Sequence, residues 1–285
     1  MGQKDEHIIE AIGKARVVVR DGKVVEVGPP LIEACPLAAR FSSPVTHATP
    51  DAIGKNIQDR IDKFGMCSPN RALTVDHDFV LFGASELMAS GISSGLLDCA
   101  VIACDGAGTV IAFSPAMVQG IGGRMSGLVR TSPIDAVIRR IGERGGIVVY
   151  PESAAIDQKE GTFAAYARGC TGVAVTVTGA EDAAAIRARF PGTMIIGVHL
   201  TGVSAEEAEK LAEHCDILSS CASRQIREVA GPRALLQGGV SIPVFAMTPA
   251  GKELIIEKIR RSSQPVVVKG SALPYAGDKV PRPLI

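Results

Sequence analysis

The second half of the chain alternates short apolar runs with amphipathic segments. Between residues 146 and 285 the apolar runs are GIVVY, GVAVTVT, TMIIGVH, CDILSS, SIPVFAM and QPVVVKG. Helix start signals separate most of them: residues 178–181 and 204–207 match the capping box, and Pro249 follows Thr248. Repeated strand and helix signals predict βαβ units. We therefore expect residues 146–285 to form an open, mostly parallel, Rossmann-like sheet with flanking helices and a Pro-rich C-terminal tail.

The first half of the chain, residues 1–145, carries more varied signals. ARVVVRDGKVVEVG has two β-branched runs around Asp21-Gly22, which suits a type I′ hairpin turn. Thr49 and Pro50 predict a helix start, and Gly65 predicts its end. CAVIAC and TVIAF predict strands on either side of the loop DGAG. The chain is thus expected to be an α/β protein whose N-terminal domain is mixed, with a hairpin and Gly-rich loops.

Composition and charge narrow the class of protein. Hydrophobic residues make up 46% of the 285 residues and aromatic residues only 4%, so the core must be aliphatic. The formal net charge is zero, which gives no basic field for nucleic acid or an anionic membrane. No apolar run approaches the ~20 residues that span a bilayer, and the charged N-terminus lacks a signal-peptide pattern. We expect a cytoplasmic protein whose Pro-rich tail packs on its own surface or forms a homo-oligomer contact.

The cysteines fall into two groups. Seven cysteines without a CxxC pair argue against a disulfide framework in a cytoplasmic protein. Four adjoin Gly, Pro or Ser at expected turns, where a thiol can reach a ligand or metal: Cys35, Cys67, Cys104 and Cys221. Three begin or precede apolar runs and are expected to fill the core: Cys99, Cys170 and Cys215.

Several polar residues follow the expected parallel strands. Ligands bind at the carboxyl ends of such strands, and here those ends carry Thr176, His199, Cys221 and Met247-Thr248. Cys221 also precedes an expected helix, whose N-terminus would stabilise a thiolate. The alternative is a small buried residue at a strand–helix junction. His199 is either a ligand or proton donor, or a hydrogen-bonded structural residue. The remaining histidines, His7 among them, have charged or loop neighbours and are expected to be solvated.

Two glycine-containing segments are candidates for cofactor contact. QGIGGRMSG contains Gly120, Gly122, Gly123, Arg124 and Ser126, and glycines let backbone N–H groups approach an anion. DGAG places Asp105 at a loop rim beside a candidate cysteine. The alternatives are a tightly packed turn and a plain hairpin loop. Neither segment matches the dinucleotide fingerprint or the P-loop.

Long motifs across the chain resemble a known family. KARVVVRDGKVVEVG, EACPL, FGMCSPNR, CDGAGTV, QGIGGRMSGLV and CASRQIREVAG are similar to the methanogenesis marker protein 8 family over residues 5–262. The resemblance implies a methanogenic archaeon and an anaerobic cytoplasm. It also implies an association with methyl-coenzyme M reductase or its maturation proteins, because the family occurs together with that enzyme.

Residues 80–142 show a second, local resemblance. The segment is similar to the N-terminal region of the coenzyme F420-reducing hydrogenase beta subunit, with Gly95-Leu96-Leu97-Asp98 at its GLID element. Those relatives carry a flavin and cysteine-bound iron–sulfur clusters. Arg124-Met125-Ser126-Gly127 departs from their Gly-Ser-x-Tyr pattern, and clustered cysteine ligands are absent from the sequence. A flavin is therefore less expected than a metal or cluster held by the dispersed thiols.

Three hypotheses follow for function. In the first, Cys35, Cys67, Cys104 and Cys221 form a thiolate site that binds a soft metal or iron–sulfur cluster, or carries electrons, in maturation or activation of methyl-coenzyme M reductase. In the second, the protein is a non-catalytic assembly factor that binds a partner enzyme. In the third, it is an enzyme acting on a phosphorylated or coenzyme-like molecule, with Cys221 as nucleophile and His199 as base.

Overall fold

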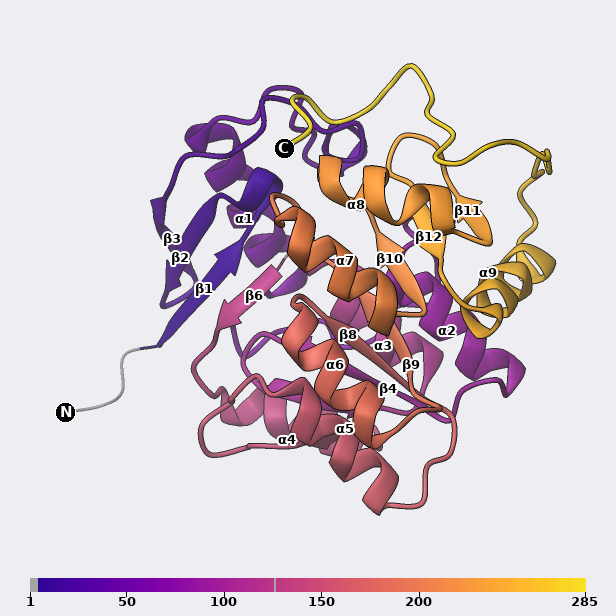
Figure 1. Ribbon diagram of the computed structural model, residues 1–285. Helices are drawn as coiled ribbons and strands as arrows, with labels where there is room; N and C mark the ends of the chain where they lie inside the picture. The colour runs from indigo at the N-terminus through magenta and orange to yellow at the C-terminus, as the bar shows by residue number, and fades with distance from the viewer. Residues whose placement is uncertain (1–4, 126) are drawn as a thin grey trace.

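The computed structural model describes residues 5–125 and 127–285 and contains two β-sheets flanked by helices (Figure 1). The expected α/β class is confirmed. The smaller sheet has the order β3-β2-β1-β6 and is antiparallel at each pairing. Its strands are β1 (Glu6–Glu10), β2 (Arg16–Arg20), β3 (Lys23–Val27) and β6 (Gly127–Arg130). Helix α1 (Pro50–Phe64) buries its isoleucines against this sheet.

Local sequence signals account for the hairpin and for α1. Asp21 and Gly22 have φ of 48° and 70°, so both take the left-handed backbone that a type I′ turn requires. The Thr49 Oγ1 accepts a hydrogen bond from the Ala52 N–H at 3.2 Å and caps α1. Gly65 ends the helix with φ of 65°. Both elements were therefore predicted correctly from local rules.

The larger sheet has the order β11-β12-β10-β9-β8-β4-β5-β7. Its strands are β4 (Cys99–Cys104), β5 (Gly108–Ala112), β7 (Ile147–Val148), β8 (Val173–Val177), β9 (Met194–Gly197), β10 (Ile217–Ser219), β11 (Leu236–Gly238) and β12 (Val244–Ala246). The central strands β4, β8, β9 and β10 are parallel, and the outer strands pair antiparallel. Strands from both halves of the chain thus share this sheet.

Helices cover both faces of the larger sheet. One apolar cluster packs on one face beneath α2 (Ala84–Ser94), α3 (Pro115–Gly122), α4 (Asp135–Glu143) and α9 (Pro249–Arg261). A second cluster packs on the other face beneath α5 (Gln158–Ala167), α6 (Ala180–Arg189), α7 (Ala205–His214) and α8 (Arg224–Val229). Short 3-10 helices are η1 (Ile12–Lys14), η2 (Ala38–Arg40) and η3 (Gly231–Arg233). None of the described helices is long and apolar enough to cross a membrane.

Two expected parallel strands are corrected by the structure. β12 runs antiparallel to β10, so Met247 and Thr248 lie at the opposite edge from Cys221. There the Thr248 Oγ1 donates to Asp216 Oδ1 at 2.6 Å, beside the start of β10. The run QPVVVKG forms no strand, and Val267 and Val268 are 91% and 86% exposed. An apolar run becomes a strand only where a neighbouring strand offers hydrogen bonds and cover, and this segment follows α9 away from the sheet.

Several smaller predictions also need correction. Helix α6 has Gly179 rather than Thr178 as its N-cap, and its Ala180 N–H donates to Glu207 Oε1 at 2.6 Å. His7 is fully buried rather than solvated. Its Nδ1 lies 2.5 Å from Thr131 Oγ1, because β1 lies between β2 and β6 and alternate residues of β1 face inward.

Candidate thiol site at the strand ends

Cys221 and His199 lie at the carboxyl ends of neighbouring parallel strands. β9 ends at Gly197 and β10 ends at Ser219, so the two residues follow adjacent strands as expected. Their φ angles are 57° for His199 and 46° for Cys221. Residues other than glycine avoid this left-handed region, and such strain concentrates at functional sites. The helix that follows Cys221 is capped by Ser223, whose Oγ accepts the Ile226 N–H at 3.1 Å.

Cys35 reaches the same place from the loop that follows β3. Among the influences on the pKa of Cys35, the charge of Cys221 is the weakest, which puts the two thiols in the same region of the molecule. The backbone N–H groups of Leu37 and Ala38 donate to the Cys35 sulfur, which favours its thiolate form. Burial has the larger effect and raises the pKa of Cys35. Both cysteines are half-buried free thiols.

The C-terminal tail links the two cysteine loops. Arg282 and Ala34 form an isolated β-bridge, with Ala34 directly preceding Cys35. Three residues further on, the Ile285 N–H donates to Ala222 O at 3.0 Å, beside Cys221. In Figure 1 the yellow tail accordingly crosses the α8 side of the molecule and ends beside the N-terminal segments. The tail therefore ties the loop of Cys35 to the loop of Cys221.

Charged neighbours shape the chemistry of this site. The Arg227 guanidinium is buried and donates to Cys221 O at 3.0 Å. Burial lowers the pKa of His199 to about 4, and the nearby charge of Lys14 acts in the same direction. The imidazole is thus neutral near pH 7 and is a weaker base than a free histidine. A Cβ on Gly127 would lie 3.4 Å from His199 Cγ, so the ring packs against the smaller sheet.

Cys67 and Cys104 form a second, fully buried thiol pair. Cys67 has φ of 54°, and its N–H donates to Asp105 Oδ2 at 2.5 Å. Cys104 immediately precedes Asp105 and ends β4. Burial, followed by the negative charge of Asp105, raises the pKa of both thiols. They are therefore protonated and shielded near neutral pH.

Arg71 organises the surroundings of this buried pair and was missed by the sequence reasoning. Its side chain is completely buried, and its Nε donates to Asp105 Oδ1 at 2.8 Å. Its remaining N–H groups donate to the carbonyls of Ala72, Gly120 and Ile121. An arginine between Asn70 and Ala72 carries no spacing signal, so only the fold reveals its role.

The Gly-rich segment is not a loop at its start, because Gly120 and Gly122 lie inside α3. A Cβ on Gly120 would lie 2.4 Å from the Leu73 backbone, so the glycine permits close packing of the helix. A Cβ on Gly123 would similarly lie 2.7 Å from the Phe79 ring. The Arg124 guanidinium lies 3.5 Å from the centroid of the Phe64 ring. Ser126 lies outside the described residues.

The four candidate cysteines are arranged as two pairs. A tetrahedral zinc site or an iron–sulfur cluster uses four ligands. Across residues 5–125 and 127–285, no group of three or more His, Cys, Asp or Glu side chains is placed to hold a metal ion. The pairs do not supply such a ligand set, so we derive no step through a metal. A metal, cluster or flavin in this protein stays a prediction.

The other cysteines take the places expected of them in the interior. Cys99 and Cys215 are buried in the cluster under α5–α8, and Cys170 packs against it. The thiols of Cys99 and Cys170 are hydrogen-bonded to each other.

The fold and the site together define an α/β protein with one half-buried thiol at the carboxyl edge of its parallel strands and a second in a loop that the C-terminal tail ties to it. The chain belongs to the family described as "Uncharacterized protein conserved in archaea", which matches residues 7–260. A protein of Methanocaldococcus jannaschii, described as uncharacterized, is 40% identical over 284 residues, covering 99% of this chain and all of that relative. No solved structure matches the chain.

Proposed function

We propose that this protein carries out thiol–disulfide redox chemistry with Cys35 and Cys221. The observation that supports this proposal is that the C-terminal tail ties together two loops that each carry a half-buried free thiol, Cys35 and Cys221. The Cys221 thiolate attacks a disulfide R–S–S–R and releases one thiol, leaving a mixed disulfide on Cys221. The Cys35 sulfur then displaces the second thiol as its own proton is lost. Two protein thiols become one disulfide, and the partner disulfide gains two electrons and two protons.

The environments of the two thiols suit these different roles. The Arg227 guanidinium donates to Cys221 O at 3.0 Å and places a positive charge beside this residue, which suits Cys221 to the attacking role. Cys35 has a raised pKa and stays protonated until the mixed disulfide forms beside it. The N–H groups of Leu37 and Ala38 then stabilise its developing negative charge. Reversal of the same steps returns the electron pair to an acceptor disulfide.

The cellular role in this proposal is maturation or activation of methyl-coenzyme M reductase. Its support is the resemblance of the long motifs to the methanogenesis marker protein 8 family, together with the archaeal family to which the chain belongs. A dithiol that delivers two electrons at a time suits reductive activation of a partner enzyme. The partner would be the reductase or one of its maturation proteins.

The redox proposal is tested by peptide mapping after oxidation. Protein prepared without air is incubated with oxidised glutathione, alkylated and analysed by mass spectrometry. We expect a Cys35–Cys221 disulfide that is lost in Cys35→Ser and in Cys221→Ser. Cys215→Ser is the matched control, because Cys215 is a buried core residue that takes no part in the proposed reaction. This variant should still form the Cys35–Cys221 disulfide. If Cys35 and Cys221 stay reduced under conditions that fully oxidise dithiothreitol, the redox proposal is wrong.

The cellular role needs a separate experiment. In an archaeon that carries the gene, a chromosomal Cys221→Ser substitution should lower the active fraction of methyl-coenzyme M reductase in extracts, whereas Cys215→Ser should not. Equal active fractions in both strains would contradict the link to this enzyme. The redox chemistry of the two thiols would still be tested separately by the peptide mapping.

A second function is favoured by the position of His199, which follows the strand next to the one that leads to Cys221. In this function His199 is the base for a Cys221 nucleophile acting on a phosphorylated or coenzyme-like molecule, and its pKa of about 4 makes the imidazole a weak base for that role. Iodoacetamide labelling of Cys221 across pH distinguishes this candidate. His199→Asn should slow labelling at neutral pH if His199 takes the thiol proton, and an unchanged rate would contradict the role.

A further inference from the structure

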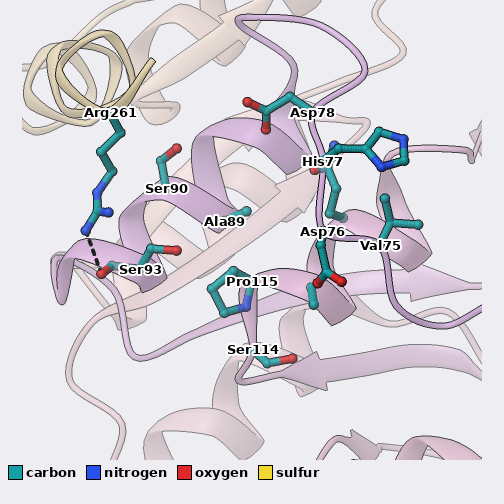
Figure 2. Close-up of a pocket in the computed structure, with 12 residues that line it drawn as sticks. Val75, Asp76, His77, Asp78, Ala89, Ser90, Ser93, Ser114, Pro115 and Arg261 are labelled. Atoms are coloured by element: carbon teal, nitrogen blue, oxygen red, sulfur yellow. Dashed lines mark hydrogen bonds between the residues drawn. The ribbon is translucent and has the colours of Figure 1, made fainter. Parts of the chain in front are cut away.

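A separate hollow of about 450 Å³ opens on the face of the larger sheet that carries α2, α3 and α9. Its walls come from α2, the first turns of α3, the end of α9 and residues 75–78 (Figure 2). None of the candidate cysteines, nor His199, lines it. A volume of this size accommodates a small organic molecule.

One wall of the hollow is held in place by a buried carboxylate. Glu86 on α2 is buried, and its Oε1 accepts hydrogen bonds from the N–H groups of Phe79 and Val80 at 3.1 and 3.3 Å. The same oxygen accepts from Gln119 Nε2 at 2.9 Å. The Val75 N–H donates to Ala116 O at 2.9 Å and joins the loop to α3. The loop that contains Asp76 is therefore positioned before any ligand arrives.

Apart from the His77 ring, which packs edge-on against Phe79, the polar side-chain atoms left over in the hollow are hydrogen-bond acceptors and hydroxyls. Gln119 is 3% exposed and lines the hollow, yet its Oε1 accepts no hydrogen bond from the described residues. The Asp76 carboxylate has no hydrogen bond or ion pair with the described residues, and Figure 2 places it beside Pro115. The Ser93 side chain is directed toward the same space.

The cations around the hollow already have partners. Arg261 donates to Glu257 Oε1 at 2.9 Å and to Ser93 O at 2.7 Å. Lys258 forms an ion pair with Asp78 at 2.5 Å. The carboxylate of Asp76 also lies over the first turn of α3, where the helix dipole would otherwise favour a bound anion. The Asp76 carboxylate thus lacks a positively charged partner, and Gln119 Oε1 lacks an N–H donor.

We propose that this hollow binds a small organic cation that carries an ammonium or guanidinium group. Asp76 forms the ion pair, Gln119 Oε1 accepts an N–H of the ligand, and Ser90 and Ser93 provide hydroxyl contacts along it. A buried amide oxygen without a donor is costly, so a ligand that donates to Gln119 gains on binding. The site is distinct from the thiol pair, and it gives the protein a way to select a nitrogenous substrate or effector.

Agmatine, which has both groups, is the probe for this proposal in isothermal titration calorimetry. We expect saturable binding below about 10 mM, and no binding of inorganic phosphate. Asp76→Asn removes the charge in an exposed loop and should weaken agmatine binding about tenfold or more. Ala89→Leu fills the hollow from α2 without a change of charge and should also weaken binding at least tenfold.

Glu253→Gln is the matched control, because it removes an exposed carboxylate on α9 that does not line the hollow. It should bind agmatine as the wild type does. Three results would overturn the proposal: no agmatine binding to the wild type, binding that neither Asp76→Asn nor Ala89→Leu weakens, or phosphate binding that Asp76→Asn strengthens.

Discussion

The buried ion pair between Arg71 and Asp105 gives the sharpest test of how this fold is held together. Both side chains are fully buried, and Asp105 also accepts the Cys67 N–H. Asp105→Asn keeps the size and one acceptor oxygen of the side chain but removes its charge. The Arg71 guanidinium would then remain charged in the interior, with only carbonyl oxygens around it.

The expected cost follows from that uncompensated charge. Removal of one partner of a buried ion pair destabilises proteins by about 3–5 kcal/mol. Total stabilities are about 5–15 kcal/mol, so Asp105→Asn should lose a large fraction of the free energy of unfolding. The exposed pair of Lys55 and Asp51, whose side chains are 75% and 77% exposed, supplies the control. Asp51→Asn should change stability by no more than about 1 kcal/mol.

Urea unfolding followed by circular dichroism measures both variants. The double variant Arg71→Met with Asp105→Asn should be more stable than the sum of the single losses predicts, because it no longer buries a lone charge. A loss below about 1 kcal/mol in Asp105→Asn, equal to that in Asp51→Asn, would refute the reasoning. Such a result would favour the alternative from the sequence, in which Asp105 in the DGAG loop contacts a cofactor.

Three other predictions follow from described contacts. The pKa of His199 lies near 4 in the folded protein and near 6.5 in an unfolded chain, so the unfolded state binds protons better and the free energy of unfolding should fall by about 1–3 kcal/mol as pH drops from 6.5 to 4. In His199→Asn, the free energy of unfolding measured with urea should depend less on pH over this range. An equal dependence on pH in the variant and the wild type would contradict this prediction. Gly120→Ala should lower the free energy of unfolding by about 2 kcal/mol or more, because the new Cβ would clash with the Leu73 backbone. Gly142→Ala, in open space on α4, should raise it by about 0.5–1 kcal/mol. Equal urea midpoints for the two variants would show that α3 can shift to relieve the clash. Cys67 and Cys104 should resist iodoacetamide in the native protein at neutral pH and react in urea, and rapid native labelling seen by mass spectrometry would show that they are accessible.

Local rules predicted elements whose causes are local. The hairpin at Asp21-Gly22 and the boundaries of α1 at Thr49 and Gly65 depend on backbone conformations and caps a few residues apart. The same rules failed for Thr178 and for the run QPVVVKG. In those places a carboxylate from another helix, or the lack of a neighbouring strand, decided the outcome.

The candidate site was only partly accessible to such reasoning. The strand-end rule placed His199 and Cys221 together, since parallel neighbours end at one edge of a sheet. It also placed Thr248 there, which is wrong because β12 runs antiparallel to β10. Strand direction depends on which strands become neighbours, and the pattern of apolar residues along one strand does not contain that information.

The sequence by itself determined the α/β class, the aliphatic core and the set of thiols near turns, because composition, periodicity and turn chemistry act over short distances. Only the tertiary structure decided which of the segments that carry these thiols lie in the same region of the molecule. Cys35 joins Cys221 through a loop and a tail that come from opposite ends of the chain, and Cys67 joins Cys104 around a buried arginine. Long-range packing and burial therefore make Cys35 and Cys221 half-buried thiols and make Cys67 and Cys104 protonated, shielded ones. The spacing of the cysteines along the sequence does not distinguish these two sets.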